Sequence, residues 1–137
     1  MGLDCSHDAW HGAYSAFHRW RIKLAEVAGY AIADLDYDGV KRETILVDWG
    51  HLQDKLYGDW DKTPDDPLLI LIAHSDCEGQ INPPQLVALA DRLDELLPEL
   101  AKAGDGGGHI GNYAEKTKQF IAGLRWAAEE NEPLLFR

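Results

Sequence analysis

The sequence is short of basic residues. Lysine and arginine together number 13, against 24 aspartates and glutamates, and the formal net charge is -11 at pH 7. A broad surface for nucleic acid or for an anionic membrane needs basic side chains gathered on one face, so this balance disfavours both partners. A small anion held in a local pocket remains compatible with the charge.

Cysteine and long apolar runs are also scarce. The only cysteines are Cys5 and Cys77, so we expect two reduced thiols rather than a disulfide framework. No segment approaches the roughly 18 apolar residues of a membrane span, and the opening Met1–Asp4 lacks the basic flank and apolar core of a secretion signal. We therefore expect a cytoplasmic protein with a single domain over residues 1–137.

Apolar spacing predicts about four helices. Apolar residues three and four apart indicate a helix over residues 11–28, and an apolar run indicates a short buried helix over 68–73. Asn82 and Asn112 each precede a further helical pattern and are suitable caps. Between these helices, residues 29–66 are predicted as an irregular insertion, with a hairpin turn at Asp38–Gly39 and a strand over 44–49.

The segment from His74 to Gln85 has the pattern of a calcium-binding EF-hand loop that has lost its end ligands. Asp76 and Glu78 occupy the third and fifth places and Gly79 the sixth, where the loop turns sharply. His74 and Gln85 replace the carboxylates at the two ends. The sequence therefore predicts the shape of the loop without affinity for calcium. The predicted fold is mainly α: about four helices, an EF-hand-like helix-loop-helix, and a small irregular or β-hairpin insertion.

The N-terminal segment is rich in polar and aromatic side chains. On a helix, His11, Tyr14, His18 and Arg21 form one stripe. Such a stripe is typical of a solvated face, but its histidine and tyrosine content also fits a binding site.

Thiolate and imidazole groups offer a zinc site as a further alternative. Cys5, His7 or His11 would combine with His74 and Cys77, since these ligand types suit tetrahedral zinc. The same residues suggest a Cys-His nucleophile pair, without the local signature of a known protease. The competing interpretation is that both cysteines pack as small apolar residues.

A glycine-rich string, Gly106–Gly111, precedes the last predicted helix. No strand precedes it, which argues against a dinucleotide-binding fold. Free amides at the helix start, with His109, Lys116 and Lys118 nearby, would attract a phosphate or carboxylate. A plain flexible linker is the alternative.

Three strings together resemble a family of small hypothetical proteins of phages, prophages and some bacteria. They are Gly2–Trp10 with Tyr14–Phe17, the loop His74–Gly79 with Ala90–Leu93, and Gly108–Asn112. The family has no established activity, so it supplies no catalytic residue. The resemblance implies a setting in which small accessory proteins counter host defence, by sequestering nucleotide-derived signals or by blocking a host protein.

We therefore predict a non-enzymatic binding protein whose separate motifs converge on one pocket for a small anionic or nucleotide-like ligand. An aromatic ring would stack on a base, while basic groups and a helix start would bind phosphate. No resident cofactor is expected. The alternatives are a metal-dependent or Cys-His hydrolase built from His7, His11, His74, Asp76 and Cys77, and an acidic inhibitor of a host protein. The predicted ligand-binding residues are His7, Trp10, His11, Tyr14, His18, Arg21, His74, Asp76, Cys77, His109, Asn112 and Lys116.

Overall fold

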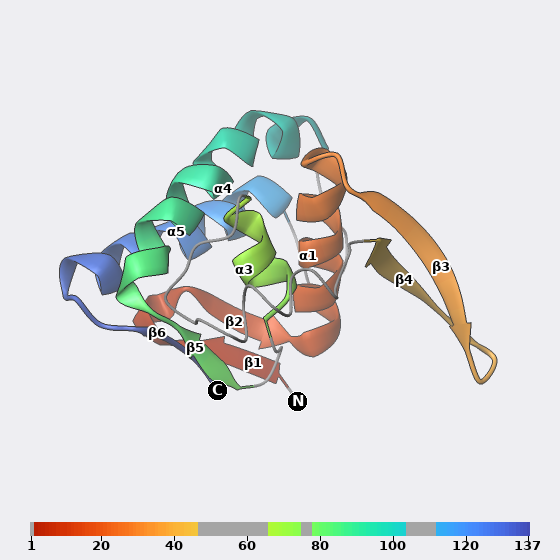
Figure 1. Cartoon of the computed structure of the whole chain (residues 1–137), viewed down its shortest axis with the longest axis horizontal. Coiled ribbons are helices and arrows are strands. Elements are labelled where there is room, and N and C mark those ends of the chain that lie inside the picture. The colour runs from red at the N-terminus through yellow and green to blue at the C-terminus, as the bar shows by residue number, and fades with distance from the viewer. Residues whose placement is uncertain (1, 47–65, 75–77, 104–111) are drawn as a thin grey trace.

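A computed structural model describes residues 2–46, 66–74, 78–103 and 112–137. Its elements combine helices with two antiparallel sheets (Figure 1). In chain order they are β1 (Gly2–Cys5), a 3-10 turn η1 (Ser6–Asp8), β2 (Trp10–Ala13), α1 (Tyr14–Val27), β3 (Ala31–Tyr37), β4 (Val40–Leu46), α3 (Leu68–Ile72), β5 (Gly79–Ile81), α4 (Pro83–Ala103), α5 (Tyr113–Glu129) and β6 (Leu134–Phe136).

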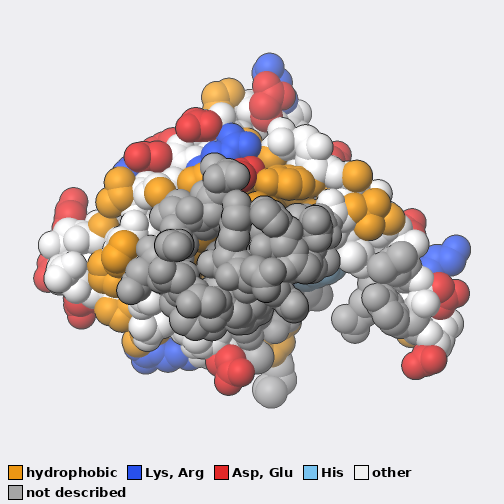
Figure 2. All heavy atoms as spheres, viewed as in Figure 1, with side chains coloured by type: hydrophobic (Ala, Val, Ile, Leu, Met, Phe, Trp, Pro, Cys, Tyr) orange, Lys and Arg blue, Asp and Glu red, His pale blue; other side chains and the backbone are white. Residues whose placement is uncertain are grey.

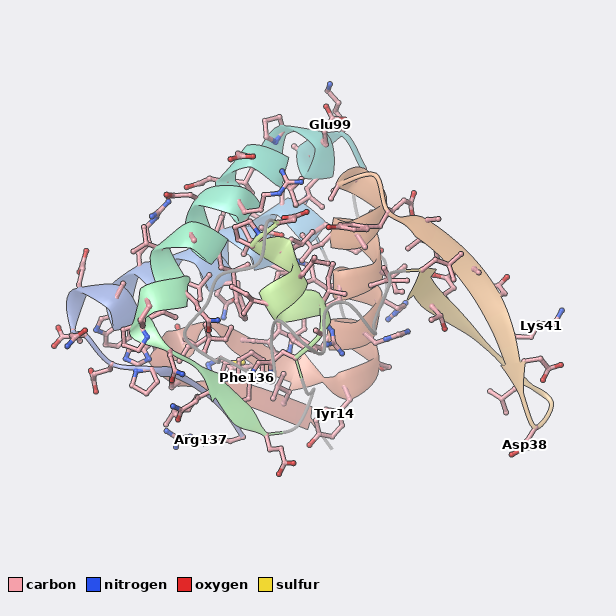
Figure 3. The ribbon with its side chains drawn as sticks, in the orientation of Figure 1. Tyr14, Asp38, Lys41, Glu99, Phe136 and Arg137 are labelled. Atoms are coloured by element: carbon pink, nitrogen blue, oxygen red, sulfur yellow. The ribbon has the colours of Figure 1, made fainter. Side chains whose placement is uncertain are left out.

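The four-stranded sheet has the order β2-β1-β6-β5, and each neighbouring pair is antiparallel. Its short strands alternate between faces, as strand geometry requires. Leu3 and Cys5 of β1 are buried, whereas Asp4 between them is exposed. In Figure 1 the helices lie above this sheet, and Figure 3 shows Phe136 of β6 beneath them. The core therefore lies between one sheet face and the helices.

The prediction of a mainly α fold was wrong, because the structure is a mixed fold with a four-stranded sheet and a separate two-stranded one. The strands of the larger sheet contain three or four residues each. So few residues give too little alternation to reveal a strand in the sequence. Moreover, β6 pairs with segments far away in the chain, and periodicity carries no information about such pairing.

Two predicted boundaries changed with the fold class. Residues 11–13, predicted as the start of the first helix, belong to strand β2 (Trp10–Ala13), and α1 begins at Tyr14. The EF-hand-like element was also wrong: α3 has only five residues, and Gly79–Ile81 is a strand of the main sheet. Residues 75–77 of that loop lie outside the described residues.

The predicted turn at Asp38–Gly39 is confirmed. Both residues have positive φ, 54° and 84°, and β3 and β4 pair on either side from Ala31↔Leu46 to Tyr37↔Val40. Asp38 and Lys41 lie at the end of the hairpin farthest from the helices (Figure 3). The hairpin accounts for most of the described part of the predicted insertion; residues 47–65 lie outside the described residues.

Helix α4 has a continuous apolar face that includes Leu86, Leu89, Leu93, Leu96 and Leu100, all buried. It packs mainly on α5. No helix among the described residues is long and apolar enough to cross a membrane. Acidic side chains lie around much of the outline of the face in Figure 2.

Candidate functional site

The aromatic side chains of the N-terminal segment belong to the core. Trp10 and Trp20 are both buried and stack at 5.0 Å between ring centroids, and Phe17 contacts both rings. Trp20 Nε1 donates to Thr117 Oγ1 at 2.9 Å. Trp10 therefore presents no open face on which a base could stack, in contrast to the predicted role of this residue.

Trp10 nevertheless has an unusual feature. Its Nε1–H is buried and has no hydrogen-bond partner among the described residues. A buried donor without an acceptor costs about 1–3 kcal/mol, so such groups are rare in folded proteins. The ammonium group of Lys116 lies 5.1 Å from the centroid of the Trp10 ring. Lys116 thus makes a cation–π contact with the face of the Trp10 ring near the start of α5.

A groove of about 430 Å³ lies along the first two turns of α5, lined by Asn112, Glu115, Lys116, Lys118 and Gln119. Asn112 caps the helix, because its side-chain oxygen accepts from the N–H of Glu115 at 3.1 Å. Glu115 also pairs with Lys118 at 3.3 Å. Lys116, by contrast, has no carboxylate within ion-pair distance among the residues that the structure describes.

His11 lies on the solvent face of the sheet and does not line this groove. Its Nδ1 lies 2.8 Å from Asp4 Oδ1 and its Nε2 lies 2.5 Å from Asp8 Oδ1. An imidazole that donates to two carboxylates must carry both protons, so its hydrogen bonds to Asp4 and, next in effect, to Asp8 raise the pKa of His11. The side chain is half exposed, which limits the energy of this arrangement.

His7 lies at the other end of α5. Its ring packs edge-on against Trp126 at 5.1 Å, its Nδ1 is 2.8 Å from Ser6 Oγ, and its Nε2 is 3.6 Å from Glu132. His7 and His11 thus bind different partners. Among the described residues, no side chain contacts both histidines.

Arg21 and His74 meet at the end of α3. Arg21 Nη1 donates to the carbonyl of His74 at 2.6 Å and lies 3.4 Å from the carbonyls of Leu71 and Ile72. Arg21 of α1 thus caps the carbonyl groups at the C-terminal end of α3. The guanidinium also lies 4.6 Å from the centroid of the Phe17 ring.

The ring of His74 stacks on Phe136 at 3.9 Å, and its Nε2–H donates to the carbonyl of Gln80 at 3.1 Å. Gly79 beside it has a φ of 101°, and a Cβ there would approach His74 Cε1 to 3.2 Å. The glycine at the sharp turn is therefore required both by its backbone conformation and by the histidine ring.

The remaining predicted residues are separate from these groups. His18 Nε2 donates to the carbonyl of Glu43 at 3.1 Å, tying α1 to the hairpin. Tyr14 packs partly buried against the core at the foot of α1 (Figure 3). Asp76, Cys77 and His109 lie outside the described residues. Of the predicted residues that the structure describes, Arg21 and His74 lie together at the end of α3, whereas His7, His11 and Lys116 have other partners, so these residues do not share one pocket.

The environment of Cys5 argues against its part in the zinc and Cys-His alternatives. Cys5 is buried, and burial, aided by Asp4, raises the pKa of its thiol to about 12. Zinc ligation and nucleophilic attack both need the thiolate, which this environment disfavours. No group of three or more His, Cys, Asp or Glu side chains in the described ranges is placed to hold a metal ion.

Sequence reasoning missed a polar cluster centred on Asp66. Its carboxylate accepts from Tyr30 at 2.8 Å, from Arg92 at 3.0 Å and from the N–H of Leu68 at 3.0 Å. Burial opposes ionisation of Asp66, but these bonds outweigh it and hold its pKa below the usual value. Burial of the Tyr30 side chain and its hydrogen bond to Asp66 raise the pKa of Tyr30 to about 12. A sequence signal for this cluster was Asp66-Pro67 before the apolar run that begins at Leu68, because this pattern commonly starts a helix.

No protein family model, no curated protein and no solved structure matches the chain. The resemblance to phage-associated proteins therefore stays a prediction. The class that the geometry defines is a mixed α and β protein with a basic groove at one helix start.

Proposed function

We propose that the protein binds a small anionic ligand in the groove at the start of α5. The observation that carries this proposal is Lys116, a half-buried cation that lines the groove and has no carboxylate partner among the described residues. A partly desolvated ammonium group interacts more strongly with an anion than one in open water. The helix start adds favourable partial charge at the same place.

The groove selects for a compact anionic group rather than for a nucleic-acid chain. Lys118 is paired with Glu115, so one uncompensated lysine and the helix start supply the attraction. The net charge of -11 repels an extended polyanion over the rest of the surface. A phosphate or carboxylate of a small metabolite fits these limits. With the resemblance to phage proteins, we propose cytoplasmic sequestration of a nucleotide-derived signal without turnover.

The experiment is a titration of the purified chain with inorganic phosphate, ADP-ribose and cyclic dinucleotides, followed by melting temperature and calorimetry. A ligand that binds the folded state raises the melting temperature. Lys116→Ala should weaken binding about 10- to 100-fold, the loss expected for one hydrogen bond to a charged group. Heat-denatured complexes should release the compound chemically intact.

The chain offers a matched control for the lysine. Lys102 on α4 pairs with Glu99 at 3.3 Å, as Lys118 pairs with Glu115, but it does not line the groove. Lys102→Ala should therefore bind like the wild type. Equal losses in Lys102→Ala and Lys116→Ala would show a general charge effect, and no binding of any of the three probes would refute the proposal.

A further inference from the structure

Ser6, His7 and Glu132 form a hydrogen-bonded chain at the opposite end of α5 from the groove. Ser6 Oγ accepts from the N–H of Leu135 at 2.8 Å, so the Ser6 hydroxyl proton is free to point elsewhere. His7 Nδ1 lies 2.8 Å from Ser6 Oγ and can accept this proton. If Nδ1 accepts, the neutral imidazole carries its proton on Nε2, which faces Glu132 Oε1 at 3.6 Å.

The donor and acceptor roles therefore run from serine to histidine to carboxylate. This is the order by which a serine nucleophile is activated: the imidazole takes the hydroxyl proton, and the carboxylate holds the ring in the right tautomer. The distance from His7 to Glu132 exceeds a hydrogen bond but lies within ion-pair range. Such contacts are often looser in ligand-free structures.

The backbone around Ser6 has the character of an active-site turn. Ser6 directly follows β1, and the next two residues, His7 and Asp8, both have a φ of 58°. Left-handed conformations of residues other than glycine cost roughly 1–3 kcal/mol each and concentrate at functional sites. The N–H of His7, early in the 3-10 turn, has no acceptor within that turn. An amide directly after the nucleophile is a recurring donor to the oxyanion in acyl transfer.

We propose that Ser6, His7 and Glu132 form an acyl-transfer site that cleaves small esters. Ser6 Oγ is the nucleophile, His7 the general base and Glu132 the positioning residue. Trp126, half exposed and edge-on to the His7 ring, supplies an apolar wall that fits an aromatic or short aliphatic acyl group. Ser6 is held rigidly, because its bond to Leu135 fixes it on β6 at the middle of the sheet.

The reaction balances without a cofactor. Ser6 Oγ forms a bond to the carbonyl carbon while its proton passes to His7 Nδ1. The bond from that carbon to the leaving oxygen breaks, and the departing alkoxide takes the proton from His7. Water then attacks the acyl-serine, its proton passes through His7 to Ser6 Oγ, and the carboxylic acid leaves.

The test is covalent labelling of the intact wild-type chain with a fluorophosphonate, a serine-directed probe, followed by peptide mapping. We expect one adduct, on Ser6. Ser15, which is exposed on α1, is the matched control, so Ser15→Ala should label like the wild type. Because Ser6→Ala also removes the bond to Leu135, mapping on the wild type decides the result whether or not that variant folds.

Glu132 is exposed enough to be replaced safely, since 58% of its side chain is accessible. Glu132→Gln should slow labelling about 10-fold or more, Glu132→Asp should restore part of the rate, and the exposed neighbour Glu130→Gln should not change it. A purely structural role would not produce rescue by aspartate. No adduct on Ser6, or an equal rate in Glu132→Gln and wild type, would overturn the proposal.

This site is independent of the proposed anion groove. From Lys116 to Trp126 the rise along α5 is roughly 15 Å, at about 1.5 Å per residue. Lys116→Ala should therefore leave labelling of Ser6 unchanged, and Glu132→Gln should leave anion binding unchanged. Failure of one proposal is thus distinguishable from failure of the other.

Discussion

At the scale of single residues, His11 links the stability of the fold to pH. Asp4 and Asp8 raise its pKa, so the arrangement stabilises the fold fully below the ordinary histidine value of about 6.5. This stabilisation is lost as the pH rises through the raised pKa. Because all three side chains are exposed, the contribution to the free energy of unfolding should be only about 0.2–1 kcal/mol.

An NMR titration of His11 checks this prediction. We expect Asp4→Asn and Asp8→Asn each to move the pKa of His11 back toward its ordinary value, and Asp34→Asn on the hairpin to leave it in place. An unchanged His11 pKa in both of the first two variants would contradict the role of the carboxylates.

Thr117 is the second residue whose effect can be stated sharply. Its Oγ1 accepts from Trp20 Nε1 and donates to the carbonyl of Tyr113 at 2.8 Å, in a completely buried position. Thr117→Val keeps the shape but leaves the Trp20 donor unpaired, so the free energy of unfolding should fall by about 1–3 kcal/mol. Urea unfolding of Thr117→Val, Trp20→Phe and the double variant measures the coupling. Additive losses would show that the bond contributes nothing.

Residue roles could be predicted from the sequence where they depend on near neighbours. The cap at Asn112 was predicted because its partner, Glu115, is three residues away. The partner of Ser6 is Leu135, which is 129 residues away, and nothing in either segment indicates the other. Trp10 was predicted to stack on a ligand, because the sequence shows that the residue is aromatic but does not show that its ring is buried.

At the scale of elements, the packing of α5 against Ala9, the residue that follows η1, depends on the absence of a side chain at Gly123. A Cβ on Gly123 would lie 2.4 Å from Ala9 Cβ and 2.8 Å from its Cα. Alanine normally stabilises a helix relative to glycine by about 1 kcal/mol. In Gly123→Ala the steric clash should outweigh this gain, so the free energy of unfolding should fall by about 1–3 kcal/mol. The exposed neighbour Ala122→Gly should lose only about 1 kcal/mol, from propensity alone.

Thermal or urea unfolding of Gly123→Ala and Ala122→Gly decides this point. A Gly123→Ala variant more stable than the wild type would mean that η1 moves away from α5 at little cost. Such a movement would also loosen Ser6 and His7, which belong to η1.

The helices were predicted better than the strands for a physical reason. Helix α4 repeats its apolar stripe over 21 residues, so its pattern is redundant. Strand β5 has three residues and is defined by its partner β6 rather than by its own composition. Only the β3–β4 hairpin, joined by an Asp-Gly turn, carried a local signal.

At the scale of the whole molecule, we expect no response to calcium. The loop from His74 to Gln85 lacks the end carboxylates of a calcium site, and Gly79–Ile81 is a strand. Because stabilisation follows the logarithm of ligand concentration over its dissociation constant, millimolar calcium should leave the melting temperature unchanged. A calcium-dependent rise that magnesium does not reproduce would contradict this expectation.

The sheet order has a consequence for synthesis on the ribosome. Strand β6 lies between β1 and β5, yet it is the last described element to be translated. Until residues 134–136 leave the exit tunnel, β1 and β5 have no strand between them, and Cys5 and Ile81 lack their partners Phe136 and Leu134. The nascent chain therefore cannot complete this core before β6 has emerged, and until then it exposes apolar surface to chaperones and proteases.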